Sequence, residues 1–340
     1  TRREQKVEGS AMREIRELLL KKVNELLENG TVDRVIGWKA GDFCYDVTPA
    51  VYKKGDNFDD FLFDGFCGAN QSKYLINETK GEGKVLALLK PCDTYSFNQL
   101  IKEHRVDREK VYVLGIPCHG KLDVNKMKEQ GITGILSIEE TEDKVKAETL
   151  YGTQECDRKS VLLERCLCCK GSKHMVYDEL LVPEEEDREV PSLDRFSKVA
   201  ELEAMTSQDR FDFWRKELSK CIRCNACRNV CPACSCRTCV FDNAASGVAA
   251  KVNADTFEEN MFHIIRAWHV AGRCTDCGEC SRVCPQNIPL QLLNRKFIKD
   301  MDELYGEFQA GEDDKTAGPL TAFTKEDCEP SIIYTRGGDR

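Results

Sequence analysis

Two copies of one cysteine pattern occupy the last third of this chain of 340 residues. Both have the spacing C-x2-C-x2-C-x3-C-P, the first over residues 221–232 and the second over residues 274–285. Runs of this kind bind 4Fe–4S clusters, because three closely spaced thiolates can hold three irons of one cube. The chemistry that these residues predict is therefore the transfer of single electrons.

The fourth cysteine of each run is expected to serve the other cluster. A proline follows it and turns the chain away, and in proteins with two such runs this cysteine ligates the neighbouring cube. Two cubes held in this way lie close together and can pass electrons to each other. The predicted ligands are Cys221, Cys224, Cys227 and Cys284 for the first cluster, and Cys231, Cys274, Cys277 and Cys280 for the second.

A structural zinc site and a disulfide framework are the two other interpretations of these runs. Structural zinc usually shows paired C-x2-C units with four ligands per ion, whereas each run here carries a third evenly spaced cysteine and a C-P pair. Disulfide frameworks are typical of small secreted domains, and we expect no secretory leader in this long chain. We therefore predict iron–sulfur clusters, with a zinc-stabilised interaction scaffold as the alternative.

A second group of cysteines precedes these runs and offers ligands for a third cluster. Cys166 and Cys169 form a C-x2-C pair, Cys118 follows a predicted strand, and Cys156 lies ahead of the pair. These four are the predicted ligands of a third 4Fe–4S cube, with Cys168 as a substitute for Cys169. Zinc, or buried free thiols that behave as small hydrophobic side chains, are the alternatives.

Seven further cysteines have no clear ligand pattern. Three of them follow the first run closely, and we expect them to pack, with extra ligation or a hydrogen bond to a cluster as alternatives. Cys92, in a Lys-Pro-Cys-Asp turn after a predicted strand, is ambiguous. The others are Cys44, Cys67, Cys234, Cys236, Cys239 and Cys328.

The charge balance disfavours nucleic acid as the main partner. The chain has 50 basic and 59 acidic residues and a formal net charge of −9, whereas phosphate binding needs clustered Lys and Arg. Twenty cysteines suggest metal binding in a reducing compartment, so we expect a cytoplasmic protein with no membrane span. Five arginines near the runs either offset cluster charge and raise reduction potentials or are solvated surface residues: Arg223, Arg228, Arg237, Arg273 and Arg282.

The first half of the chain predicts an α/β domain with a largely parallel sheet. Short buried strands alternate with helices there, a pattern typical of such sheets. Cys92 and Cys118 follow two of the strands, at the sheet edge where functional groups gather. The predicted strands are residues 85–89, 111–114 and 132–138, and the predicted helices are residues 12–29, 97–104 and 123–130.

The second half predicts a helical, ferredoxin-like region. Helices are expected near residues 192–204 and 207–219, and a third between the two cysteine runs, where an apolar stripe is expected to pack in the core: Phe257, Met261, Ile264, Ile265 and Trp268. The predicted division is an α/β domain over residues 1–183, a charged linker and connecting helix over 184–206, the dicluster domain over 207–308, and an extended tail over 309–340.

The chain resembles the iron–sulfur beta subunits of cytoplasmic sulfhydrogenases and the A subunit of anaerobic sulfite reductase. The resemblance rests on the turns at residues 89–93 and 115–118, on residues 221–236 and on residues 274–285. Residues 165–181 are also similar to beta subunits of coenzyme F420-dependent hydrogenases and dehydrogenases. Such families imply a relay between a flavin-containing NAD(P)H- or F420-type partner and a hydrogenase, heterodisulfide-reductase-like protein, formate dehydrogenase or sulfite reductase.

The leading hypothesis is thus a non-catalytic electron-transfer subunit with two or three 4Fe–4S clusters. No nucleophile–base arrangement stands out among the five histidines, so no catalytic residue is predicted: His104, His119, His174, His263 and His269. The alternative is a flavin-bearing reductase that itself oxidises or reduces NAD(P)H or F420. We find no G-x-G-x-x-G strand–turn–helix, so FAD is expected in a partner subunit rather than in this chain.

Overall fold

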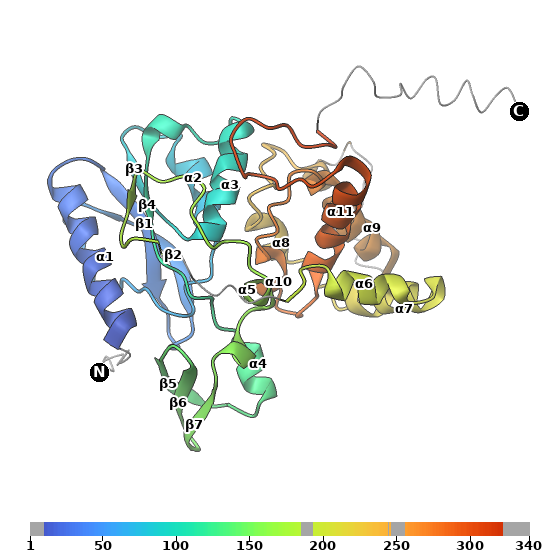
Figure 1. Cartoon of the computed structure of the whole chain (residues 1–340), viewed down its shortest axis with the longest axis horizontal. Helices are drawn as coiled ribbons and strands as arrows, with labels where there is room; N and C mark the ends of the chain where they lie inside the picture. The colour runs from blue at the N-terminus through green and yellow to red at the C-terminus, as the bar shows by residue number, and fades with distance from the viewer. Residues whose placement is uncertain (1–9, 185–192, 244, 246–255, 322–340) are drawn as a thin grey trace, which may run out of the picture.

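The computed structural model describes residues 10–184, 193–243, 245 and 256–321 of the chain. An α/β domain comes first, a small antiparallel sheet follows, and a helical region packs beside them (Figure 1). This order confirms the predicted fold class, an α/β domain with a mostly parallel sheet and then a helical dicluster region. Residues 185–192, in the segment predicted as a charged linker, lie outside the described residues.

A five-stranded sheet forms the centre of the α/β domain, and four of its strands are mutually parallel. All five residues of the third strand in chain order are buried, as is typical of a parallel strand covered on both faces. In spatial order the strands are β2 (Val47–Lys53), β1 (Arg34–Ala40), β3 (Val85–Leu89), β4 (Val111–Gly115) and β8 (Glu179–Leu180). The predicted strands β3 and β4 are thus confirmed.

Three helices, α1 (Ser10–Glu28), α2 (Ser72–Glu78) and α3 (Pro91–Lys102), cover the two faces of this sheet. Successive side chains of a strand point to opposite faces. Accordingly, Leu88 of β3 packs in the core that includes α1, and Leu89 packs in the core that includes α2 and α3. A short 3-10 helix, η1 (Arg108–Lys110), leads into β4.

Helix α3 begins at Pro91, six residues before the start expected from the apolar spacing. Proline is favourable in the first helical turn, and the Asp93 carboxylate accepts a hydrogen bond from the backbone N–H of Lys90. The Lys90 ammonium pairs with Asp93 at 2.7 Å and donates to the carbonyl of Ala69 at 2.8 Å. Both charged side chains are almost fully buried, so this helix start depends on their pairing.

A separate three-stranded antiparallel sheet follows the α/β layer. It consists of β5 (Ile135–Glu140), β6 (Lys144–Thr149) and β7 (Gly152–Asp157). The strand predicted over residues 132–138 exists, but it belongs to this sheet rather than to the parallel one. Exposed and buried residues alternate along β6, the pattern of a sheet with one solvated face. Helix α4 (Val124–Glu129) and the 3-10 helix η2 (Lys159–Val161) pack beneath it.

Short helices and loops build the rest of the described chain. The helices predicted near residues 192–204 and 207–219 are confirmed, and so is the helix predicted between the two cysteine runs. The elements are α5 (Glu164–Leu167), α6 (Ser197–Ala204), α7 (Ser207–Leu218), α8 (Ala226–Asn229), η3 (Val240–Asp242), α9 (Thr256–Val270), α10 (Glu279–Arg282) and α11 (Leu290–Tyr305). Among the described residues, no helix combines the length and apolarity that a membrane span requires.

The apolar stripe predicted on α9 faces the core only in part: Ile265 packs against the core around Cys227 and Cys280, but three other members are exposed. Phe257, Ile264 and Trp268 are 69%, 42% and 60% exposed. The buried face of α9 instead mixes Phe262 and Val270 with polar residues, which are Glu259, His263 and Arg266. Periodicity predicts the helix correctly but only the edge of its buried face, because that face also carries charged side chains.

The described part of the predicted tail, residues 309–321, runs over α3. The Asn98 side chain of that helix donates to the carbonyl of Gly311 at 3.1 Å. Gly311 has a φ of 77° and lies against the backbone of Tyr95, where a Cβ would collide. This segment therefore ties the end of the helical region to the α/β domain. Residues 322–340 lie outside the described residues.

We expect Asp93→Ala to destabilise the protein by about 3–5 kcal/mol, because it leaves the Lys90 charge buried without its partner. Urea-induced unfolding measures the loss. The double variant Lys90→Met/Asp93→Leu removes both charges and should recover most of the stability. A loss below about 1 kcal/mol in the single variant, the size typical of an exposed pair, would contradict this account.

Candidate metal centre

The two cysteine runs fold into loops with the same backbone conformation. In the first, Arg223 and Asn225 have φ values of 53° and 62°; in the second, Asp276 and Gly278 have φ values of 56° and 65°. These residues stand at equivalent positions, on either side of the second cysteine of each run. Because non-glycine residues rarely adopt this left-handed conformation, its recurrence shows that both loops coil in the same way around their cysteines.

The four thiols predicted for the first cluster line one small cavity, which is completed by Phe262 and His263 of α9. They are Cys221, Cys224, Cys227 and Cys284. Three come from the first run and the fourth from the second, so the chain crosses over as the spacing predicts. Four thiols around one cavity fit the four iron corners of a cube. Within the described residues, no three His, Cys, Asp or Glu side chains converge tightly enough for a single metal ion.

The four thiols predicted for the second cluster are also neighbours. The Cys231 thiol interacts electrostatically with Cys274, Cys277 and Cys280, although it belongs to the first run. Cys231 and Cys280 are buried. This set therefore has the same interleaved composition as the first, with three thiols from one loop and one from the other.

Burial makes five of these eight thiols poor thiolates without a cation. Cys231 differs, because its hydrogen bond with Cys234 lowers its pKa to about 6. Burial raises the pKa of Cys221 to about 11 and that of Cys227 to about 12. Cys274 and Cys277 have their pKa raised by the same cause. Iron binds the deprotonated form, so cluster binding would release protons from these buried sulfurs.

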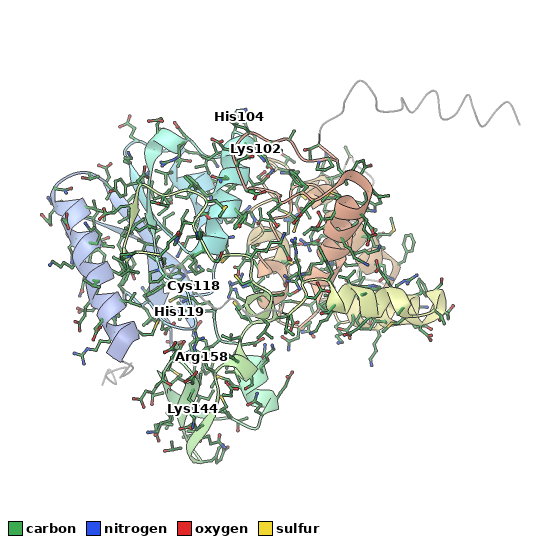
Figure 2. All side chains as sticks on the ribbon, in the orientation of Figure 1. Lys102, His104, Cys118, His119, Lys144 and Arg158 are labelled. Carbon is green, nitrogen blue, oxygen red and sulfur yellow. The ribbon has the colours of Figure 1, made fainter. Side chains whose placement is uncertain are left out.

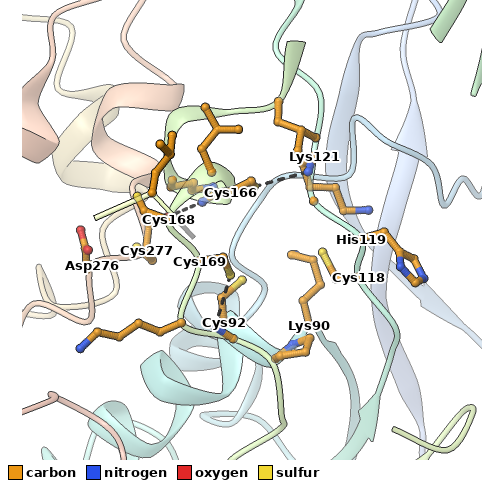
Figure 3. A pocket seen from close by; sticks show the side chains of 18 of the residues that line it. Lys90, Cys92, Cys118, His119, Lys121, Cys166, Cys168, Cys169, Asp276 and Cys277 are labelled. Atoms are coloured by element: carbon orange, nitrogen blue, oxygen red, sulfur yellow. Dashed lines mark hydrogen bonds between the residues drawn. The ribbon is translucent and has the colours of Figure 1, made fainter. Parts of the chain in front are cut away.

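A cavity of about 950 Å³ lies between the α/β domain, the small sheet and the second cysteine loop. Cys118 and His119 at the end of the main sheet and Arg158 near the small sheet mark this junction in Figure 2. Six cysteines line the cavity, and Figure 3 labels all of them: Cys92, Cys118, Cys166, Cys168, Cys169 and Cys277. We call Cys92, Cys118, Cys166 and Cys169 the third thiol set, and they come from three segments of the chain. Cys277 belongs to the second set, and Cys168 accepts a hydrogen bond from Arg295.

The parallel sheet explains why Cys92 and Cys118 meet. Leu89 of β3 is paired in register with Gly115 of β4. Cys92 follows Leu89 by three residues, and Cys118 follows Gly115 by three residues. Both cysteines therefore lie at the same edge of the sheet. The Cys92 thiol interacts electrostatically with Cys118 and Cys169. The position of both cysteines after predicted strands is the sequence feature that indicates this arrangement, although spacing alone defines no role for Cys92.

Cys156 does not join this group. It lies on β7 opposite Val145 of β6, and it packs against the apolar core beneath the small sheet rather than lining the cavity. The predicted third set therefore needs correction at one position. The antiparallel hairpin directs Cys156 into its own core, whereas the parallel strand end brings Cys92 to the cavity.

Buried cations surround the large cavity. Lys90, Lys121, Arg158 and Arg165 line it, and each is at most 9% exposed. The Arg165 guanidinium also donates to Glu279 at 2.6 Å and to the backbone carbonyl of Cys277. The wall of the large cavity is thus joined directly to the loop of the second thiol set.

Other cysteines lie near these sets with different contacts. Cys168 accepts a hydrogen bond from Arg295 at 2.9 Å, and Cys234 lies beside Cys231 with its sulfur hydrogen-bonded to it. Cys236 is exposed. Cys67 is buried, and its thiol contacts Asp64. Of the cysteines after the first run, Cys239 packs against a core cluster as expected. Cys234 matches the alternative of a hydrogen-bonded thiol beside a predicted ligand, and the packing prediction fails for Cys236.

Comparison with known proteins adds two kinds of match. Residues 217–288 match the model of a 4Fe-4S dicluster domain. The chain is 23% identical over 335 residues to the F420-dependent formate dehydrogenase subunit beta of Methanocaldococcus jannaschii, covering 82% of this chain and 88% of the relative. It is 24% identical over 361 residues to the F420-dependent formate dehydrogenase 1 subunit beta of Methanococcus maripaludis, covering 87% and 90%.

A solved structure is also similar in part. One chain of the F420-reducing NiFe hydrogenase complex of Methanosarcina barkeri superimposes with a TM-score of 0.35 and 17% identity, over 45% of this chain and 62% of that chain. The sequence comparisons confirm the predicted dicluster domain and agree with an iron–sulfur electron-transfer subunit. The narrower resemblance to sulfhydrogenase and anaerobic sulfite reductase subunits stays a prediction.

The crossing-over of the two runs can be tested with serine variants. Cys284→Ser should remove or distort the same cube as Cys227→Ser, although it belongs to the other run. Cys231→Ser should in turn match Cys274→Ser. Electron paramagnetic resonance of the reduced proteins compares the cubes that remain. A Cys231→Ser spectrum that resembled that of Cys227→Ser would show that each run holds its own cube.

The third thiol set has a matched pair of variants. Cys92→Ala should lower the iron content from about twelve to about eight atoms per chain, because it removes one ligand of a four-iron cube. Cys156→Ala is the control, since that thiol packs outside the cavity, and it should leave the iron content unchanged. Iron analysis after anaerobic reconstitution decides between them. A loss of four iron atoms in Cys156→Ala, with no loss in Cys92→Ala, would show that Cys156 is the ligand.

Proposed function

We propose that this chain is the electron-relay subunit of a multisubunit oxidoreductase and that it binds three 4Fe–4S clusters. Such clusters accept and release one electron at a time when bound. The proposed ligand sets are Cys92, Cys118, Cys166 and Cys169 at the large cavity; Cys231, Cys274, Cys277 and Cys280 next to it; and Cys221, Cys224, Cys227 and Cys284 beyond.

The contact between neighbouring thiol sets is the observation that supports this proposal most directly. Cys277 belongs to the second set and also lines the large cavity. Cys227 of the first set interacts electrostatically with Cys280 of the second, and their helices α8 and α10 are in contact. The three sets therefore form a continuous series. A series of redox sites in contact is what an electron relay requires.

The far end of the series reaches the protein surface. Cys224 is exposed, and its neighbour in the loop, Ile222, is 60% exposed. The large cavity, in contrast, is lined by buried cations. We therefore propose that electrons enter or leave at the large cavity on one side and at the loop of the first set on the other, where a partner subunit would bind.

The relatives suggest the two redox partners. The two similar beta subunits belong by name to F420-dependent formate dehydrogenases. We propose that a flavin-containing partner subunit, reduced by a deazaflavin-type coenzyme, contacts the chain at the large cavity. A catalytic dehydrogenase subunit would contact the loop of the first set. All cysteines in the described residues are free of disulfides, which fits the proposed cytoplasmic location.

A second candidate function, a flavin-bearing reductase, is favoured by the size of the cavity. A volume of about 950 Å³ is at the upper end of small-molecule sites, and it exceeds what one cube needs. The Lys121 ammonium would offer donors to a flavin phosphate there, whereas Arg158 and Arg165 already donate to Glu140 and Glu279. In this alternative the chain itself would accept hydride equivalents before the cubes.

Reduced F420 tests both candidates. If the chain is only a relay, reduced F420 should bleach the visible absorbance of the cubes in the native complex. It should not bleach the isolated chain, which lacks the partner's flavin. If the isolated chain with added FAD is also bleached, the flavin-bearing function holds. Bleaching by NADPH but not by reduced F420 would contradict the proposed coenzyme. A native complex that neither reductant bleaches would contradict the relay.

A further inference from the structure

A buried arginine, Arg266 of α9, lies between the first two thiol sets. It is 2% exposed. The thiols that act most strongly on its charge are Cys227 of the first set and Cys280 and Cys231 of the second. Packing agrees with this position, because α9 contributes Phe262 to the core around Cys227 and Cys280. Its guanidinium therefore faces both sets from one side.

The guanidinium of Arg266 has no oxygen or nitrogen acceptor within the part of the chain that the structure describes, although all three of its nitrogen atoms are buried. Its side chain hydrogen-bonds with the Cys280 thiol, and its charge also interacts with Cys227, Cys231 and Cys234. A buried charge without an anionic partner is expensive, so this position points to an anionic group that belongs between α9 and the thiols.

Three of the arginines near the cysteine runs have carboxylate partners. Arg228 pairs with Asp242 at 2.9 Å, and Arg282 donates to Glu279 at 2.7 Å. Arg273, which directly precedes Cys274, forms a two-point contact with Glu103. The Arg228 and Arg273 pairs carry little net charge. Glu279 serves both Arg282 and Arg165, so this triad keeps one positive charge beside Cys277 of the second set. Arg266 differs from these arginines because its charge acts on thiols of both sets and no carboxylate accepts a hydrogen bond from it in the described residues.

We propose that Arg266 supplies the positive charge shared by the two ferredoxin-type cubes and raises the reduction potential of both. This inference rests on the proposed function, in which these thiols hold two cubes. A cube with four thiolate ligands is an anion, and reduction makes it more negative. A cation placed beside both cubes therefore stabilises their reduced forms. Arg266 is a positioning residue in this account and takes no part in bond chemistry.

The test compares Arg266→Met with Arg266→Lys in the full chain. Potentiometric titration followed by electron paramagnetic resonance gives the midpoint of each cube, assigned with the Cys284→Ser and Cys231→Ser variants. Arg266→Met should lower the equilibrium constant for reduction of both cubes at least about tenfold, equal to 59 mV for a one-electron couple. Arg266→Lys keeps the charge and should stay closer to the original protein.

A charge-neutral control is available in Glu103→Gln/Arg273→Gln, which removes a pair next to Cys274 without changing the net charge. It should leave both midpoints in place. Loss of cubes from Arg266→Met but not from Arg266→Lys would also support the proposal, because only the charge differs. Unchanged midpoints in Arg266→Met, a shift in one cube alone, or loss of cubes from both variants would overturn it. An unsubstituted chain that binds no iron would instead reject the proposed function.

Discussion

The exchange of one cysteine between two loops is the constraint on which this structure depends. Cys231 lies among the thiols of the second loop and Cys284 among those of the first. Neither set is complete unless both loops are folded and in contact. The two loops use the same left-handed turns at equivalent positions, and the helices that follow them touch. Cluster binding and the folding of this region are therefore expected to be one event.

The same region is tied to the α/β domain at the large cavity. Arg165 connects the segment of Cys166 to Cys277 and Glu279, and the end of the helical region crosses α3 through Gly311. These contacts fix the third thiol set against the second. A parallel sheet delivers its strand ends to one edge, so the domain provides a rigid support for the start of the series.

Local sequence patterns predict most of the elements and the two dicluster thiol sets. The errors concern residues whose position depends on contacts between distant parts of the chain. The two cysteine runs and the buried strands β3 and β4 follow from spacing and apolarity alone. Cys156 is not a ligand in this structure, and the sequence gives no sign of the strand that places it in the core beneath the small sheet. Most of the predicted α9 stripe is exposed because periodicity assumes an apolar core. His263 and Arg266 are buried on this helix instead, and His263 lines the cavity of the first thiol set. Arg266 itself lies outside both motifs, so no spacing rule identifies it.

Iron and acid-labile sulfide, measured together per chain after anaerobic isolation, test the central claim most directly. The account predicts about twelve atoms of each, since three four-iron cubes contribute equal amounts of both. A protein that contained zinc without sulfide, or that stayed colourless and free of iron after reconstitution, would contradict it.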